Sequence, residues 1–211
     1  VVIGANGDAF CAGADLRQVQ RLPEMSTTVA YDWPADMVSI HQLMLEAPKP
    51  VIAAVNGPAY AGGMGLAGMC DVIVAVRTAS FALPEARIGL FPMIIVAHLA
   101  RSVPRKTLLE MMFTGEPIDA EEAHRVGFVN RVVEDRSELD EAVAQYARRF
   151  ERVSPDAIRL GRQAFSILSE MPADAALRSA RIFNVPVFGS DDFAEGTAAF
   201  LEKRRPGWDQ P

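Results

Sequence analysis

The chain has 211 residues, of which 50% are hydrophobic and 23% are charged, and its formal net charge is −6. This length suffices to bury a core without disulfides or metals, and the acidic balance argues against nucleic-acid binding, which needs a basic surface. Cys11 and Cys70 lie far apart and the three histidines lack metal-binding spacing, so we expect no disulfide, no metal site and unrelated structural or surface histidines.

The first half of the sequence predicts buried strands separated by turns and short helices. We interpret the first residues, VVIGA, as a buried strand, because they form a β-branched run that ends at the turn signal Asn6-Gly7. The sequence therefore starts within a folded unit. A polar segment, helical or mobile, then extends to Met25. The predicted strands are 1–5, 50–57, 71–76 and 80–83, and the predicted helices are 36–46, a brief helix in the glycine segment between the second and third strands, and a buried helix at 92–101.

The second half predicts mainly helices. Asp119 and Glu122 have the spacing of a capping box and open a helix that Gly127 ends. A strand follows at 128–133. Residues 137–203 are expected to form helices broken at Pro155, Pro172 and Pro186. The pattern predicts an α/β core over residues 1–150 and a helical C-terminal region over 151–211.

The segment Gly63-Met64-Gly65-Leu66-Ala67-Gly68 spells the dinucleotide-binding pattern G-x-G-x-x-G, with Glu85 about 20 residues further on. In a Rossmann unit the first glycine ends the strand and the acid lies at the tip of the next strand. Here residues 56–61 intervene, and the next strand ends at Arg77-Thr78. The topology therefore disfavours a dinucleotide site.

Two other interpretations of these glycines stay open. They can simply allow a helix and a strand to pack closely. Alternatively, Gly62 and Gly63 open a short helix whose free N–H groups and positive dipole end face an anion. A second glycine turn, residues 11–15, also follows a strand and leaves its amides uncovered. Two such amides facing one oxygen would form an oxyanion hole, which stabilises an enolate or a tetrahedral alkoxide.

The combination of motifs resembles the crotonase family, the enoyl-CoA hydratases and isomerases. An opening strand pair and a helix normally precede VVIGA in that family, and we interpret them as absent here. The resemblance implies a spiral core of repeated ββα turns and a helical C-terminal region that builds homotrimers, often paired into homohexamers. The matching segments are FCAGADL (10–16), KPVIAAVNGPAYAGGMGLAGMCDVIVA (49–75), FALPEARIGLFP (81–92), TGEPIDAEEAHRVGFVNRVV (114–133) and AFLEKRRPGW (199–208).

The resemblance also implies an acyl-CoA thioester substrate, with no separate cofactor. Its carbonyl oxygen would be held by the backbone amides of Ala14 and Gly62. Arg17 would meet the CoA phosphates, while Phe200 and Lys203 would reach CoA across a subunit boundary; a plain surface or packing role for these three is the alternative. The remaining predicted substrate contacts are Ala12, Asp15 and Leu16 at the adenine and Gly63, Gly65 and Pro84 beside the reacting groups.

The hydratase pattern of that family uses two glutamates. Glu85, in Leu83-Pro84-Glu85, matches the second, so it is the predicted general acid/base, with a surface carboxylate as the alternative. The first glutamate falls at Gly65, which has no carboxylate. A further departure is Pro92-Met93-Ile94-Ile95, where the family often has a glycine-rich segment, and it reshapes the expected acyl pocket.

Three functions fit this single glutamate. The first is hydration of a 2-enoyl-CoA, since some members acting on branched or carboxylated enoyl thioesters share the glycine. The second is isomerisation between 3-enoyl and 2-enoyl-CoA by Glu85 alone, and the third is acyl-CoA binding without catalysis. The sequence contains no signal peptide and no apolar run of the roughly 20 residues that a membrane helix needs. We therefore expect a cytoplasmic protein without membrane contact.

Overall fold

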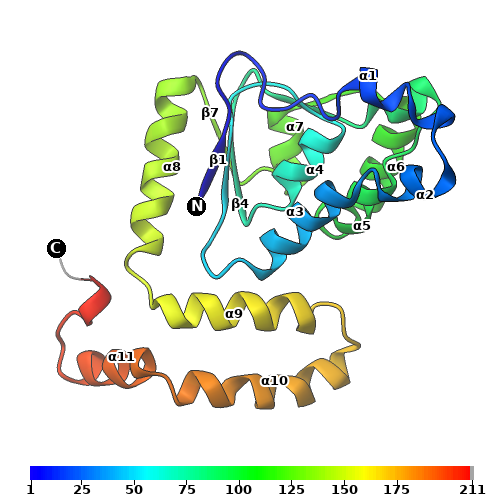
Figure 1. The fold of residues 1–211 in the computed structure, drawn as a ribbon. Helices are drawn as coiled ribbons and strands as arrows, with labels where there is room; N and C mark the ends of the chain where they lie inside the picture. The colour runs from blue at the N-terminus through cyan, green and yellow to red at the C-terminus, as the bar shows by residue number, and fades with distance from the viewer. Residues whose placement is uncertain (210–211) are drawn as a thin grey trace. The chain divides into compact units, whose positions relative to one another are not determined.

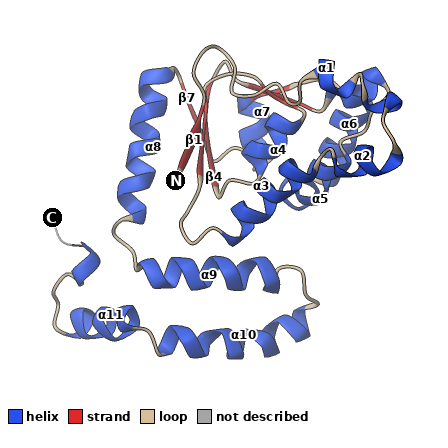
Figure 2. Ribbon diagram, in the orientation of Figure 1, coloured by secondary structure: helices blue, strands red, loops and turns tan. Residues whose placement is uncertain are grey.

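The computed structural model describes residues 1–209, which fold as two compact units (Figures 1 and 2). Unit 1 comprises Val1–Met44 and Val51–Val143, and unit 2 comprises Leu45–Pro50 and the described part of Ala144–Pro211. Unit 1 is α/β and unit 2 is helical, so the predicted α/β class is confirmed. No helix within residues 1–209 is both long and apolar enough to cross a membrane.

The seven strands within the described residues all belong to unit 1. They are β1 (Val2–Gly4), β2 (Ile52–Val55), β3 (Ala59–Tyr60), β4 (Val72–Val76), β5 (Ser80–Ala82), β6 (Ile118–Asp119) and β7 (Arg131–Val133). The helices that begin in unit 1 are α1 (Leu16–Val19), η1 (Leu22–Glu24), α2 (Thr27–Asp32), α3 (Ala35–Glu46), α4 (Gly62–Gly68), η2 (Pro84–Ile88), α5 (Met93–Ser102), α6 (Arg105–Thr114), α7 (Ala120–Arg125) and α8 (Arg136–Phe150), which continues into unit 2. Unit 2 adds α9 (Pro155–Leu168), α10 (Ala173–Phe188), α11 (Asp191–Leu201) and η3 (Gly207–Asp209).

The larger sheet is parallel throughout, in the order β1-β2-β4-β7. Every residue of β2 is buried, as are four of the five residues of β4. Central parallel strands are covered on both faces, which explains their near-continuous runs of Val, Ile and Ala. Figure 1 shows α7 on one side of this sheet and the first part of α8 on the other.

The smaller sheet, β3-β5-β6, positions the glycine segment. Strands β3 and β5 are parallel, with Ala59 opposite Phe81 and Tyr60 opposite Ala82, whereas β6 is antiparallel to β5. An isolated parallel bridge pairs Cys11 with Ala59 on the other side of β3. Three chain segments therefore run side by side in the same direction and end at the same edge.

Several predicted details are confirmed in unit 1 and in the helical tail. The Asp119 side chain accepts the Glu122 N–H at 2.7 Å and so opens α7. Pro155 occupies the first turn of α9, and Pro172 immediately precedes α10. Each proline lies where no helical N–H is needed.

Other details of the predicted elements are wrong. Pro186 does not break α10, which runs on to Phe188, because in the last turn a proline removes only one hydrogen bond before the helix ends. The helix predicted as buried at 92–101 buries only one stripe, at Ile95 and Leu99, while Met93 is 70% exposed. The strand predicted at 50–57 ends at Val55, and the separate strand β3, along with α2 and α6, was not predicted.

We predict that Leu99→Ala lowers the free energy of unfolding by about 2–5 kcal/mol. Leu99 is fully buried, and its Cδ2 would lie only 2.6 Å from a Cβ added at Gly68, so it packs tightly against α4. Chemical denaturation measures the loss. The control Met93→Ala, on the exposed side of the same helix, should change stability by no more than about 0.5 kcal/mol. Equal losses in the two variants would contradict this packing.

Candidate active site

Three predicted site segments leave the small sheet at the same register. Cys11, Ala59 and Phe81 form one row across it. Three residues beyond that row come Ala14, Gly62 and Pro84, and Glu85 follows Pro84. Since parallel strands lie about 4.8 Å apart, the register brings both predicted amides and the predicted acid/base to one edge of the sheet.

The turn that carries Ala14 lies directly against the start of α4. Gly13 has φ +95°, a conformation that glycine adopts without strain, and a Cβ there would lie 3.3 Å from the Gly62 nitrogen. Within residues 1–209, neither the Ala14 nor the Gly62 amide donates a hydrogen bond to another group of the chain. Gly13 directly precedes Ala14, so this contact brings the turn that carries the Ala14 amide next to the Gly62 amide. An oxygen held by two N–H donors lies about 2.9 Å from each nitrogen.

The backbone before Gly62 is held in an uncommon conformation. Ala61 has φ 51° and ψ −126°, which costs a non-glycine residue of order 1–3 kcal/mol. Its N–H donates to the Ala82 carbonyl at 2.9 Å, at the end of β5. This bond ties the start of α4 to the segment that carries Glu85, and the surrounding structure thereby fixes the direction of the Gly62 amide.

The other glycines of the pattern serve close packing. A Cβ at Gly63 would lie 2.0 Å from the Cys11 carbonyl oxygen, so only glycine lets α4 approach the first segment. A Cβ at Gly65 would lie 2.3 Å from Cγ2 and 2.8 Å from Cβ of Ile95. The interpretation that a glycine allows close packing of a helix and a strand is therefore confirmed for Gly63, whereas Gly65 allows close packing of α4 and helix α5.

Glu85 lies in η2, which Pro84 opens and Gly89 ends. Its Oε2 is buried and has no hydrogen-bond partner among the described residues. Burial raises the pKa of the Glu85 carboxyl above its ordinary value of 4.5, and a backbone hydrogen bond opposes the rise. Arg87, two residues on, donates to the Thr114 carbonyl at 3.1 Å and holds this segment against the end of α6. A carboxyl group with a raised pKa and a free oxygen is suited to proton transfer.

An apolar side chain fills the space beside Gly65, the position at which the resemblance implies a glutamate in hydratases. Ile95, from α5, occupies the volume that a side chain at Gly65 would need. Ile95 itself is buried and belongs to the segment that departs from the family pattern. Glycine at position 65 and isoleucine at position 95 therefore depend on each other, because the Ile95 side chain fits only where residue 65 has no side chain.

Two histidines meet beside Gly65, so the prediction of unrelated histidines is wrong for this pair. The rings of His41 and His98 are 4.8 Å apart between centroids. His98 Nε2 donates to the Gly65 carbonyl at 3.0 Å, and His41 Nδ1 donates to the Met37 carbonyl at 2.6 Å. His41 and His98 are 57 positions apart in sequence, and only the packing of α3 and α5 around α4 brings them together.

The predicted CoA contacts fall in two places. Ala12, Asp15, Leu16 and Arg17 are all exposed along the turn and α1, where Asp15 Oδ1 also accepts the Arg17 N–H at 2.9 Å and caps the helix. Phe200 and Lys203 belong to unit 2, and their roles stay predictions. Within residues 1–209, no group of three His, Cys, Asp or Glu side chains could hold a metal ion.

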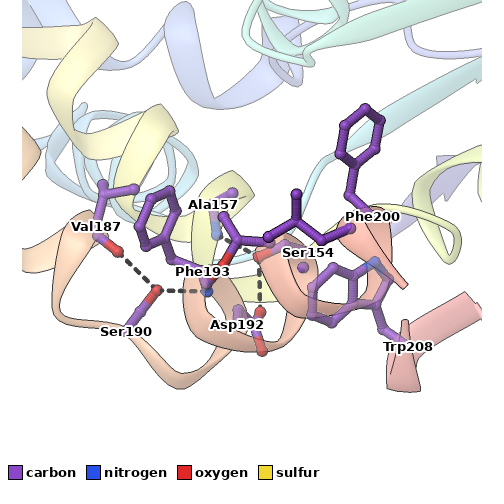
Figure 3. Close-up of a pocket in the computed structure, with 11 residues that line it drawn as sticks. Ser154, Ala157, Val187, Ser190, Asp192, Phe193, Phe200 and Trp208 are labelled. Atoms are coloured by element: carbon purple, nitrogen blue, oxygen red, sulfur yellow. Dashed lines mark hydrogen bonds between the residues drawn. The ribbon is translucent and has the colours of Figure 1, made fainter. Parts of the chain in front are cut away.

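Unit 2 contains an apolar cavity of about 430 Å³ (Figure 3). Phe193, Phe200 and Trp208 contribute aromatic rings to its lining. A polar edge is built from helix caps, in which Ser154 donates to Asp192 at 2.7 Å and Ser190 donates to the Val187 carbonyl at 2.8 Å. Asp192, a carboxylate in this lining, accepts hydrogen bonds from Ser154 Oγ and the Asp156 N–H, whereas Glu85 Oε2 has no partner among the described residues.

A family model described as enoyl-CoA hydratase/isomerase matches residues 1–211. The chain belongs to the enoyl-CoA hydratase/isomerase family. Carnitinyl-CoA dehydratase from Salmonella typhi is 38% identical to it, over 99% of this chain and 80% of that protein. Human enoyl-CoA hydratase domain-containing protein 3, a mitochondrial protein, is 36% identical, over 99% of this chain and 68% of that protein.

Solved structures of the hydratase/isomerase family have the same fold. An enoyl-CoA hydratase from Mycobacterium smegmatis superposes with a TM-score of 0.92 at 35% identity, covering 99% of this chain and 80% of that one. Human enoyl-CoA hydratase domain-containing protein 3 gives a TM-score of 0.87 at 35% identity, covering 98% and 81%. The predicted crotonase-type fold is confirmed.

We predict that Gly65→Ala destabilises this family member by about 1–3 kcal/mol, because its Cβ would collide with Ile95. Ile95→Ala removes the closest atom, so Gly65→Ala should cost less when made in the Ile95→Ala background. A double-mutant cycle of unfolding free energies measures this coupling. If the losses of unfolding free energy in the two single variants simply add in the double variant, Ile95 does not fill the space beside Gly65.

Gly161→Ala is the matched control. Gly161 lies inside α9 with no atom within 4 Å of its Cβ position, so the substitution should stabilise the chain by about 0.5–1 kcal/mol.

The buried His98 predicts a loss of stability in acid. Burial lowers the pKa of His98 from 6.5 to about 4, partly offset by its hydrogen bond to Gly65. Below pH 6.5 the unfolded chain takes up this proton and the folded chain does not, so stability falls between pH 6.5 and 4 by up to about 3 kcal/mol. Urea unfolding across this range should show a shallower decline for His98→Gln than for the wild type. Parallel curves would contradict the prediction.

Proposed function

We propose that this chain catalyses the reversible addition of water to a 2-enoyl-CoA thioester. The observation that carries the proposal is the buried, unpartnered Oε2 of Glu85, at the sheet edge where the Ala14 and Gly62 amides also lie. The relatives named as a hydratase and as a dehydratase support a hydro-lyase. Acyl-CoA thioesters are the substrate class that this family membership favours.

The two amides would stabilise the charge that develops on the thioester oxygen. Their N–H groups are fixed before substrate arrives, because Ala61 is held by Ala82 and Gly13 packs against Gly62. Preorganised donors of this kind favour the enolate over the neutral thioester. The positive end of the α4 dipole adds to the effect at Gly62.

Glu85 would then act as both base and acid. As the water oxygen bonds to C3, the water O–H breaks and its proton moves to the Glu85 carboxylate, while the double-bond electrons move into the enolate. Glu85 next returns the proton to C2, the enolate collapses to the thioester, and the product is a 3-hydroxyacyl-CoA. The raised pKa of Glu85 brings it closer to the working pH, where one group both takes and gives a proton efficiently.

The CoA portion would follow the exposed turn of unit 1. Backbone groups of Ala12, Asp15 and Leu16 are proposed to meet the adenine, and Arg17 a phosphate, all from solvent-accessible positions. Phe200 and Lys203 are proposed to contact CoA bound to another copy. The large exposed apolar side chains of unit 2, among them Leu177, Ile182 and Phe200, support assembly into a homotrimer or homohexamer.

Isomerisation of a 3-enoyl-CoA to a 2-enoyl-CoA is the second candidate. The apolar Ile95 beside Gly65 favours it, since moving a proton between C4 and C2 needs one carboxylate and no water. A steady-state assay separates the two reactions, because only hydration yields a 3-hydroxyacyl-CoA.

We predict that Glu85→Gln lowers kcat for hydration by at least about 100-fold, since glutamine cannot carry the proton. Binding of a saturated acyl-CoA should change little. The control Glu110→Gln, at an exposed position of α6, should keep full activity. If the wild type binds acyl-CoA but turns over neither 2-enoyl nor 3-enoyl-CoA, the chain is a non-catalytic binder.

The same residue sets the pH dependence. Glu85 must be ionised to take the proton from water, and burial raises its pKa, so kcat/KM should rise with pH through an apparent pKa above 4.5. A plateau that already begins below pH 4.5 would contradict the assignment of Glu85 as the base.

A further inference from the structure

Helix α3 lies along α4, beside the proposed oxyanion amide. The Met37 Cε would be 3.1 Å from a Cβ at Gly62, and His41 Nε2 would be 3.7 Å from a Cβ at Gly65. Met37 and His41 are one helical turn apart, as are the two α4 positions that they face. One face of α3 therefore presents a thioether at the first residue of α4 and an imidazole one turn further on.

The hydrogen bonds fix the tautomer of His41. Its Nδ1 lies 2.6 Å from the Met37 carbonyl oxygen, which can only accept, so Nδ1 carries the hydrogen. In the neutral ring this leaves a lone pair on Nε2. The His41 side chain therefore offers one hydrogen-bond acceptor toward α4.

That acceptor has no partner within residues 1–209. His41 is only 9% exposed, and Nε2 is buried without a hydrogen bond to any described residue. The neighbouring His98 ring cannot supply one through its Nε2, which is bonded to the Gly65 carbonyl. Buried polar atoms are nearly always satisfied, so an unpartnered one beside a candidate active site indicates a ligand or water that it receives.

Hydration creates a need for such an acceptor. A water molecule held by Glu85 alone can rotate about that one hydrogen bond. A second acceptor prevents this rotation and keeps a lone pair of the water oxygen directed at C3. C3 is two carbon–carbon bonds from the thioester carbon, so the water that attacks it would lie near the amide that holds the thioester oxygen. His41 faces α4 one helical turn beyond that amide, at Gly65.

We propose that His41 Nε2 accepts a hydrogen bond from the substrate water and orients it for attack. The inference rests on the proposed hydration. The water donates one hydrogen to Glu85 and the other to His41. Only the first is transferred, so His41 keeps its own protonation state throughout and acts as a water-orienting residue.

Two assays on the full chain separate this role from that of Glu85. The first is hydration of but-2-enoyl-CoA. The second is exchange of the C2 hydrogens of butanoyl-CoA in D2O, in which Glu85 removes a proton from C2 and returns a deuteron, with no water added to C3. Exchange uses the amides and Glu85 and does not use an oriented water.

His41→Phe removes the acceptor and keeps a planar ring, whereas His41→Gln keeps an acceptor oxygen. We expect His41→Phe to lower kcat for hydration about 10–100-fold, with KM and the exchange rate within about twofold of the wild type. His41→Gln should recover most of the lost kcat. The control His124→Phe, in α7, should leave both rates unchanged.

The proposal is overturned if His41→Phe keeps the hydration kcat, if His41→Gln is as impaired as His41→Phe, or if hydration, exchange and Tm fall together. Those results would leave the proposed function standing, because the wild type would still hydrate and exchange. A wild type that binds butanoyl-CoA but does neither would overturn the proposed function and this inference with it.

Discussion

The register of three parallel segments is the constraint on which the candidate site depends. Cys11, Ala59 and Phe81 pair in one row across the sheet. The three segments that carry them therefore leave the sheet at the same edge. The three groups of the candidate site lie a few residues past that row: an amide donor in the first turn, another at the start of α4, and a carboxyl in η2. A slip of one residue in any of the three would turn its site group away from the others.

The close contacts around α4 explain why the glycine pattern misleads. Its glycines permit three neighbours to approach: the Cys11 carbonyl at Gly63, Ile95 at Gly65 and Leu99 at Gly68. The residue proposed to hold an oxyanion, Gly62, stands one position ahead of the pattern. A motif that signals phosphate binding in one topology signals helix packing in another, and only the path of the chain distinguishes them.

Local signals made most of the fold predictable. Apolar runs located β1, β2 and β4, and the capping box at Asp119 located α7. The two-residue strand β3 was missed because nothing in Ala59-Tyr60 distinguishes it from a loop; its partner strands define it. The His41–His98 contact was missed for a similar reason, since it depends on how two distant helices pack on α4. In both cases the information lies in tertiary contacts rather than in local sequence.

The bond between Ala61 and Ala82 has a consequence for how such a protein diversifies. It joins the backbone before one proposed amide to the strand that precedes Glu85, so the groups proposed to handle charge share one hydrogen-bonded backbone frame. Side chains that pack beside Gly62 and Gly65 come from outside it: Met37 and His41 belong to α3, and Ile95 belongs to α5. Substitutions on α3 and α5 would therefore change the space beside Gly62 and Gly65 and leave in place the backbone that holds the groups of the proposed function, so one proposed chemistry could accept differently shaped acyl groups.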